Sequence, residues 1–263
     1  MTKAKDESWA KICKDYKILK HDFAESPFAI TAKDIGKACQ DFPNPSQKEA
    51  RILCKQDHRG DRPKVFQEHD LFLLPVNNGE YVILKGEGYF DIPEIKGEKD
   101  YRSKFPFRLL TSEVGNSEMQ HLDYAYATSL VRKFADDPTL NLTIRGRKYT
   151  GAGGGGFSFV AGDAKHLVEV RSVQTEVDAG YEGEKQIVLV EAKGGKASDL
   201  IIRQLYYPFR QWQRLGKATR VFLFTRQGDL SNLWEFEFTD PDDYHSIRLK
   251  KSGAFRISLK ANS

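Results

Sequence analysis

Residues 174–193 read QTEVDAGYEGEKQIVLVEAK, and the expected fold is built outward from this stretch. Its last eight residues, QIVLVEAK, form an apolar run that ends in charge, which predicts a buried strand. Side chains alternate along a strand, so Glu191 and Lys193 should project from the same face as Ile187 and Leu189. Burying charge without a purpose is costly, so this carboxylate and ammonium group are candidates for function.

The segment before it is also predicted to be extended. Leu167 to Asp178 reads as a strand, which would put Glu176 and Asp178 on one face. Gly180 and Gly183 then supply a turn that brings this strand beside the next one. The sequence therefore predicts two neighbouring strands that both carry acids.

Acids on adjacent strands indicate a metal site. Asp178 and Glu191 offer the hard oxygen ligands that Mg²⁺ prefers, with waters and a substrate phosphate completing its shell. Lys193 would orient or help deprotonate an attacking water and stabilise charge growing on the phosphorus. Glu176, beside Asp178, would be a supporting group or an additional ligand.

An acid followed two residues later by lysine is common by itself. The same triplet occurs at 15–17, 94–96 and 163–165. Only the triplet at 191–193 ends an apolar strand with a strand-borne acid upstream. An ordinary surface ion pair is the alternative interpretation.

Helices should flank these strands. An apolar stripe predicts a helix from Ser117 to Phe134. From Asp199 a second helix should pack through Ile201, Leu205, Pro208 and Trp212, with Arg203, Gln204, Tyr207 and Arg210 partly on its other side. Pro208 should kink or end it, and Tyr206 and Tyr207 are expected in core or interface packing. Further strands are predicted at 220–225 and 233–239, and a final hairpin at 246–259.

The first hundred residues have a different character. Helices are predicted from Glu7 to Lys20, from a Thr31 cap to Cys39, and around Lys48 to Cys54. Strands at 71–76 and 81–84 are joined by Asn-Asn-Gly, which favours a hairpin. These parts are typical of a winged helix. A polar linker is predicted from Pro93 to Arg108, dividing the chain into residues 1–100 and 101–263.

Basic residues cluster beside the third predicted helix. They could contact phosphates or base edges of DNA, or form a solvated face. The cluster comprises Arg51, Lys55, His58, Arg59, Arg62 and Lys64.

Composition sets broad limits. The 263 residues carry a net charge of +4, which suits a polyanionic partner without demanding one. The three cysteines have no CxxC spacing and are expected to be reduced thiols. No signal peptide or membrane-length apolar run is apparent, so a cytoplasmic protein is expected. No histidine pair has zinc spacing, no GxSxG occurs, and GAGGGG at 151–156 lacks P-loop residues.

Asp178, then Glu191-Ala192-Lys193 on the next strand, then an amphipathic helix resembles the PD-(D/E)XK nuclease superfamily, with an EVD variant that lacks the proline. The stretches QTEVDAGYEG, VLVEAK and RQLYYPFRQW, with SEMQHLDYAYATSL and LLPVNNGEYVILKGEGY upstream, resemble one family of bacterial type II restriction enzymes. The resemblance covers about residues 50 to 245.

This resemblance implies an α/β (α+β) fold, with a restriction-endonuclease-like mixed central sheet flanked by helices behind the winged-helix-like domain. It implies Mg²⁺-dependent hydrolysis of specific duplex DNA that leaves 5′ phosphates, and a cognate DNA methyltransferase as partner. Asp178 and Glu191 would be metal ligands and Lys193 the catalytic lysine. Glu118 would be a supporting metal acid or a solvent-facing glutamate. Gln204 would support the site, and Arg203 and Arg210 would meet phosphates.

Cutting two strands requires two active sites or two binding events, so a homodimer is expected. Two other functions stay open. One is a repair or structure-specific nuclease with the same core, and the other is a non-catalytic winged-helix regulator.

Overall fold

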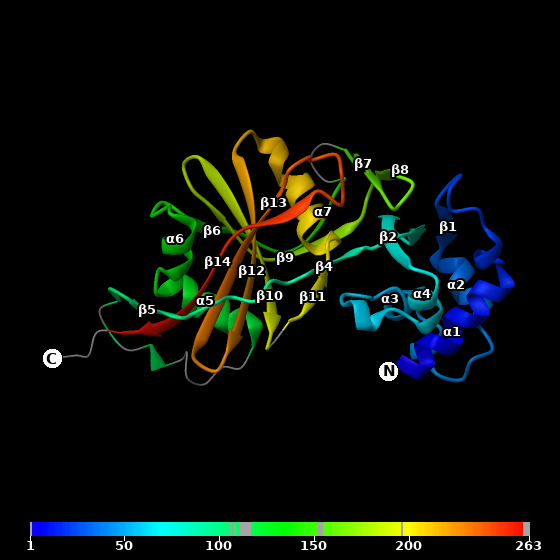
Figure 1. The fold of residues 1–263 in the computed structure, drawn as a ribbon, viewed down its shortest axis with the longest axis horizontal. Helices are drawn as coiled ribbons and strands as arrows, with labels where there is room; N and C mark the ends of the chain where they lie inside the picture. Colours follow the sequence, from blue (N-terminus) through cyan, green and yellow to red (C-terminus); the bar gives the residue numbers. More distant parts are fainter. Residues whose placement is uncertain are drawn as a thin grey trace.

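The computed structural model describes residues 2–105, 107, 109–110, 117–151, 155–195 and 197–259. Within these ranges the chain is a mixed α and β protein with seven α-helices and four sheets. Figure 1 places the N-terminal helices at one end and the largest sheet toward the other, with α7 between them. No helix in the described ranges is long and apolar enough to cross a membrane.

The largest sheet has seven strands and mixed direction. Its order is β5 (Lys99–Arg102), β14 (Ile247–Ser258), β13 (Leu230–Phe238), β12 (Ala218–Gln227), β10 (Gln186–Gly194), β9 (Gln174–Glu182) and β6 (Asn141–Tyr149). The pairs β10–β12 and β14–β5 are parallel and the others antiparallel. The expected mixed central sheet flanked by helices is therefore present.

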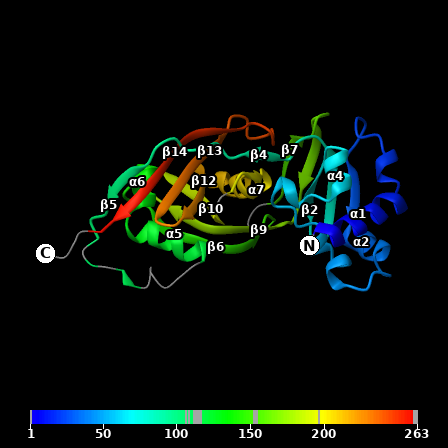
Figure 2. The same ribbon diagram turned by 60° about the horizontal axis from the view of Figure 1, so that its bottom comes forward.

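Helices cover both faces of this sheet. On one face lie α5 (Glu118–Ala127) and α6 (Leu130–Ala135), and on the other lies α7 (Arg203–Trp212). Strand β10 alternates accordingly: Val188 and Val190 pack with α5 and α6, whereas Ile187 and Leu189 pack in the α7 layer. The period of two therefore puts Glu191 and Lys193 on the α7 side. Figure 2 gives a second view of these layers.

Three predicted boundaries were wrong, and the hairpin predicted at 246–259 is the single strand β14. The helix predicted from Ser117 to Phe134 is two helices, because Ser129 adopts a left-handed conformation with φ 67°. The strand predicted from 167 to 178 is also two, β8 (His166–Val170) in a hairpin with β7 (Phe157–Ala161), and then β9. Gly180 lies inside β9 opposite Leu189, and only Gly183 takes part in the turn.

The segment after β10 also differs from its prediction. Residues Asp199–Ile201 form β11, paired with β4 (Tyr89–Asp91), and the helix starts only at Arg203. It then continues through Pro208 to Trp212. The hydroxyls of Tyr206 and Tyr207 anchor it on both sides through Pro241 O (2.6 Å) and Pro75 O (2.9 Å). Both tyrosines are buried, as expected.

The N-terminal part combines helices with a three-stranded sheet of order β1-β3-β2. Its elements are α1 (Thr2–Asp15), β1 (Phe28–Thr31), α2 (Ala32–Ala38), α3 (Ala50–Leu53), α4 (Lys64–Glu68), β2 (Leu71–Asn77) and β3 (Glu80–Lys85). Short 3-10 helices lie at Ile18–Lys20, Pro45–Gln47, Arg59–Asp61 and, in the C-terminal part, Gln213–Leu215. The Thr31 cap and the β2–β3 hairpin are confirmed, with Gly79 at φ 72° in the turn.

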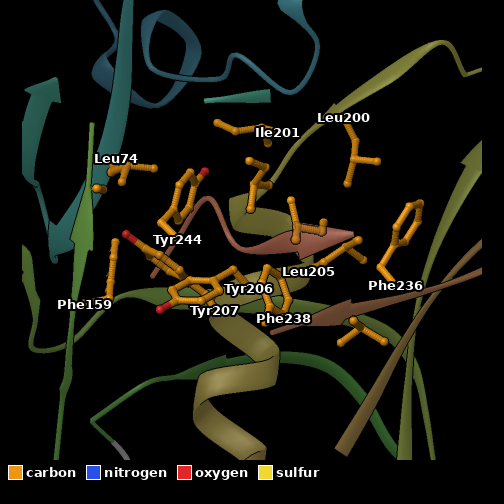
Figure 3. Packing of buried hydrophobic residues seen from close by; sticks show 14 of the residues in the cluster. Leu74, Phe159, Leu200, Ile201, Leu205, Tyr206, Tyr207, Phe236, Phe238 and Tyr244 are labelled. Atoms are coloured by element: carbon orange, nitrogen blue, oxygen red, sulfur yellow. The ribbon is translucent and has the colours of Figure 1, made fainter. Parts of the chain in front are cut away.

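Strand β2 is buried on both faces. Leu71 and Leu73 pack in the N-terminal core, whereas Phe72 and Leu74 belong to the core under α7. Figure 3 shows Leu74 in this second core near Phe159 and Tyr244. The hairpin is therefore not a free wing: one face of its sheet packs on the C-terminal part.

The predicted linker from Pro93 to Arg108 is part of the fold where it is described. Its strand β5 pairs with β14, and Trp234 donates to Pro93 O at 2.8 Å. Pro106 and Arg108 lie outside the described residues, as do residues 152–154 of the GAGGGG segment. The described cysteines are free thiols.

Candidate active site

The end of β10 carries a shielded ion pair. Lys193 Nζ lies 2.8 Å from Glu191 Oε1, and the two side chains are only 15% and 11% exposed. Both residues line the same cavity beside α7. The charged end of the apolar strand thus faces a cavity, unlike an ordinary surface ion pair.

Asp178 reaches this site through an irregularity in β9. Its neighbour Val177 packs in the α7 layer, but Ala179 packs in the α5–α6 layer, so strict alternation fails at this point. The pairing of β6 with β9 shifts register here, between Ile144 and Gly146. Asp178 Oδ2 accepts a hydrogen bond from Ala192 N at 2.7 Å, which ties the carboxylate to β10.

Burial sets the protonation of the three groups. It raises the pKa of Glu191 to about 7, against the attraction of Lys193 and with help from the charge of Asp178. Burial also raises the pKa of Asp178. For Lys193, burial alone would lower the pKa, but the attraction of Glu191 prevails and raises it. Lys193 is therefore an ammonium group at neutral pH. The Glu191 carboxyl beside it is near the midpoint of its titration at this pH.

The cavity has a volume of about 750 Å³ and lies between the two parts of the chain. The C-terminal part contributes residues from β6, β9, β10 and α5, and α7 adds Arg203 and Gln204. The N-terminal part contributes Arg51, Lys55 and Asp57, and the hairpin tip Asn77–Gly79.

Charges along this lining balance. The five basic residues are Arg51, Lys55, Arg147, Lys193 and Arg203, and the five acidic ones are Asp57, Glu118, Glu176, Asp178 and Glu191. A divalent cation would therefore make the lining net positive.

The other two candidate acids, Glu118 and Glu176, bond to groups other than Asp178 and Glu191. Glu118 Oε1 accepts from Gly194 N at 2.5 Å, and Glu176 pairs with Arg147 at 3.2 Å. Within the described ranges, no three His, Cys, Asp or Glu side chains are grouped so that they could hold one ion. The expected third metal ligand, Glu118, is therefore not assembled with the other two.

Asp178 and Glu191 nevertheless fit a magnesium ion as a pair. Neither Asp178 Oδ1 nor Glu191 Oε2 has a hydrogen bond from the residues that the structure describes. Mg²⁺ needs only one or two protein carboxylates besides waters and phosphate oxygens. A carboxyl group with a raised pKa would also gain from a nearby cation.

Gln204 lies beside the site on α7. Its Oε1 atom is buried and lacks a hydrogen-bond partner in the described part of the chain. The residue lines the main cavity and an adjoining one of about 10 Å³ that Glu191 also lines. A volume of this size holds about one water.

Three of the predicted basic contacts line the cavity. Arg51 and Lys55 are exposed there, with side chains 83% and 74% accessible. Arg203 lines it too, but lies 3.6 Å from Asp57.

The other five predicted contacts do not line it, among them His58, whose Nδ1 lies 2.9 Å from Asp199 O. Arg62 and Arg210 are buried, since their guanidinium groups bond to Leu71 O and to the Tyr206 hydroxyl. Arg59 is held by Glu87 and Asp91, and Lys64 pairs with Glu68 on α4. The guanidinium groups of Arg59, Arg62 and Arg210 are engaged by protein groups, which does not support their expected role in DNA contact. The Lys64 side chain stays 76% accessible outside the cavity, so its DNA contact stays a prediction.

Sequence reasoning missed several lining residues. Strand β6, which carries Arg147 and Tyr149, is an exposed edge strand whose polar sequence has no clear alternation. Asp57 is a loop residue brought to the site only by tertiary packing. Asn77 and Asn78 were recognised as turn formers, which says nothing about what the turn faces.

Two family models match the chain. Residues 6–83 match Domain of unknown function (DUF6996), and residues 84–256 match Domain of unknown function (DUF6997). The junction between the two matches falls within β3. The second match therefore includes Asp178, Glu191 and Lys193, and the first includes the cavity residues of the N-terminal part. No curated protein and no solved structure matches.

Proposed function

The chain belongs to the DUF6997 family, and we propose that it is a Mg²⁺-dependent endonuclease that hydrolyses specific duplex DNA and leaves 5′ phosphates. The observation that carries this proposal is the grouping of Asp178, Glu191 and Lys193 in one cavity. Two of these groups are carboxyls with raised pKa values, and the third is their ammonium neighbour. Perturbed titratable groups in a cleft are typical of catalytic sites.

The order of elements supports the same conclusion. Acid-bearing β9 is followed by β10 with its Glu-Ala-Lys triplet and then by the amphipathic α7, as the resemblance to the PD-(D/E)XK superfamily implies. Strands β10 and β12 are parallel, and α7 lies in the connection between them. The helix therefore packs back over the strands that carry the acids. A restriction-endonuclease-like fold accounts for this arrangement.

Each side chain then has a role in hydrolysis. Asp178 and Glu191 would hold Mg²⁺, which, when bound, supplies positive charge to the scissile phosphate and acidifies a water. Lys193, kept protonated by Glu191, donates hydrogen bonds to the attacking water and to the charge that develops on the phosphate. Gln204 shares the small adjoining cavity with Glu191, and its unpaired Oε1 would accept a hydrogen bond from a water held there.

The N-terminal part supports DNA as the substrate. Its short helices and its β1-β3-β2 sheet are elements from which a winged-helix-like module would be built. The wall of the cavity on this side carries exposed Arg51 and Lys55. Basic side chains of this kind contact phosphates and position a duplex.

The biological setting proposed is restriction in the cytoplasm. A cognate DNA methyltransferase would protect the host's own sites, and a homodimer would cut both strands.

Digestion of unmethylated phage DNA with Mg²⁺ tests this function. The wild-type protein should give discrete fragments with 5′ phosphate ends, and Asp178→Asn should give none. Asp243→Asn is a matched control, since this acid pairs with Lys165 away from the cavity. Smears or nicks would favour a repair or structure-specific nuclease, and binding without any cleavage would favour a regulator.

A further inference from the structure

The two parts of the chain are joined by an extensive bonded interface. Arg171 N donates to Val76 O at 2.8 Å and Tyr207 Oη donates to Pro75 O at 2.9 Å, both beside the hairpin tip. Arg171 also pairs with Glu80 on β3 at 2.6 Å. The hairpin is thereby fixed to β8–β9 and α7 just before it reaches the cavity.

The wall beyond α3 is fixed as well. Asp199 Oδ1 accepts from Arg59 N at 2.8 Å, and Asp199 O lies 2.9 Å from His58 Nδ1. Ile201 N donates to Asp57 O at 3.0 Å. With β2 buried on both faces, these contacts leave the N-terminal part little freedom to turn away from the catalytic strands.

The distance along the cavity is short. A space of about 750 Å³ has a cube root of about 9 Å, and even a groove twice as long as wide spans under about 20 Å. At about 3.4 Å for each base pair, this is about six base pairs. A duplex lying over Glu191 would therefore meet α3 and the hairpin tip within about half a helical turn.

We propose that the N-terminal module reads the same short duplex segment that the catalytic strands cut. In this arrangement Asn78 contacts base edges and Lys55 contacts a phosphate. This inference rests on the proposed nuclease function. It assigns base readout to the N-terminal module and predicts that the cut lies inside the recognition sequence or within about six base pairs of it.

The two residues differ in what they can recognise. Asn78 is exposed at the hairpin tip, and no hydrogen bond of its side chain occurs among the described residues, whereas Asn77 donates to Glu80. An asparagine amide can pair with the edge of an adenine. Lys55 is 74% accessible, with Asp57 3.7 Å away. An ammonium group at the end of a flexible chain suits a phosphate and carries no sequence information.

The test is to map cut ends and the surrounding sequence over unmethylated DNA with the full chain and Mg²⁺. The wild-type protein should cut at the short distance given above. Asn78→Ala should keep the cut position but relax the preference at one base pair, with a loss of discrimination of about 10-fold or more. Lys55→Ala should keep the preference, weaken binding at all sites and reduce the salt slope by about one.

Thermal melting first establishes that each variant is folded. If Asn78→Ala is not, Asn78→Asp replaces it, because it keeps the size but loses the amide donors. A cut farther than about six base pairs from the recognition sequence would overturn this inference and leave the nuclease function standing. An unchanged preference in a folded Asn78 variant would overturn it too. Absence of any cleavage by the wild-type protein would instead overturn the nuclease function and this inference with it.

Discussion

The raised pKa of Glu191 makes the stability of the metal-free protein depend on pH in a definite direction. Its pKa is about 7 in the folded protein, against 4.5 for the ordinary group. A difference of about 2.5 units corresponds to about 3 kcal/mol. Below about pH 4.5 the carboxyl is protonated in both states, and this group costs nothing. Between about pH 4.5 and 7 the unfolded state loses this proton while the folded state keeps it, so stability falls across this window. The loss is complete once the buried carboxyl ionises above pH 7.

Glu191→Gln removes this titration while keeping the size of the side chain. Unfolding by urea, measured without divalent cations from pH 4.5 to 8, should show the wild-type protein losing up to about 3 kcal/mol more than the variant. The loss of the Lys193 partner adds an offset, which changes little over this range because Asp57 and Asp178 still favour the charged form of Lys193. Only the difference in slope is therefore diagnostic. Parallel stability curves for the two proteins would refute the reasoning about Glu191.

Three shorter predictions follow from the same contacts. DNA binding should tighten by about 10-fold or more when Ca²⁺ is added at pH 8, because the charge-balanced cavity becomes net positive; equal affinity in a fluorescence-anisotropy titration with chelator would contradict this. Arg62→Ala should lower the free energy of unfolding by about 1–3 kcal/mol, because it removes buried hydrogen bonds. Arg51→Ala should weaken DNA binding and change the free energy of unfolding by less than about 0.5 kcal/mol. Reversed effects would show that the wrong arginine was assigned to the cavity. Gly180→Ala should destabilise by about 1–3 kcal/mol, because the added Cβ would lie 2.7 Å from the Ile144 Cβ; an unchanged melting temperature would mean that β6 can shift aside.

Local signals predicted the parts of the fold that local chemistry determines. The apolar run of β10 with its charged end, the Thr31 cap and the Asn-Asn-Gly hairpin all depend on residues close together in sequence. The shared face of Glu191 and Lys193 follows from strand geometry alone. These elements carry two of the three principal site residues.

What the sequence could not provide depends on distant packing. The irregularity at Asp178 arises because its two neighbours pack in different layers, which alternation cannot reveal. The guanidinium group of Arg62 is buried against the carbonyl of Leu71 at the start of β2, and that of Arg210 against the carbonyl of Pro241 beyond β13. A charge cluster in the sequence therefore does not distinguish a structural arginine from one that faces a ligand.

The cavity residues of the N-terminal module could not be predicted from the sequence either. Asp57, Asn77 and Asn78 reach the cavity because β2 is buried between two cores. A strand that is apolar on both faces signals burial, but not which part of the chain covers the second face. The interface thus became visible only in three dimensions.

Cleavage of unmethylated duplex DNA in Mg²⁺ by Lys193→Ala, measured beside Lys96→Ala, tests the catalytic assignment most directly. Lys96 is the exposed lysine of another acid–x–lysine triplet, so the control removes the same group outside the cavity. Lys193→Ala is expected to slow cleavage by at least about 100-fold with DNA binding largely retained, and Lys96→Ala to cleave at the wild-type rate. Equal cleavage by the two variants, or none by the wild-type protein, would contradict the account.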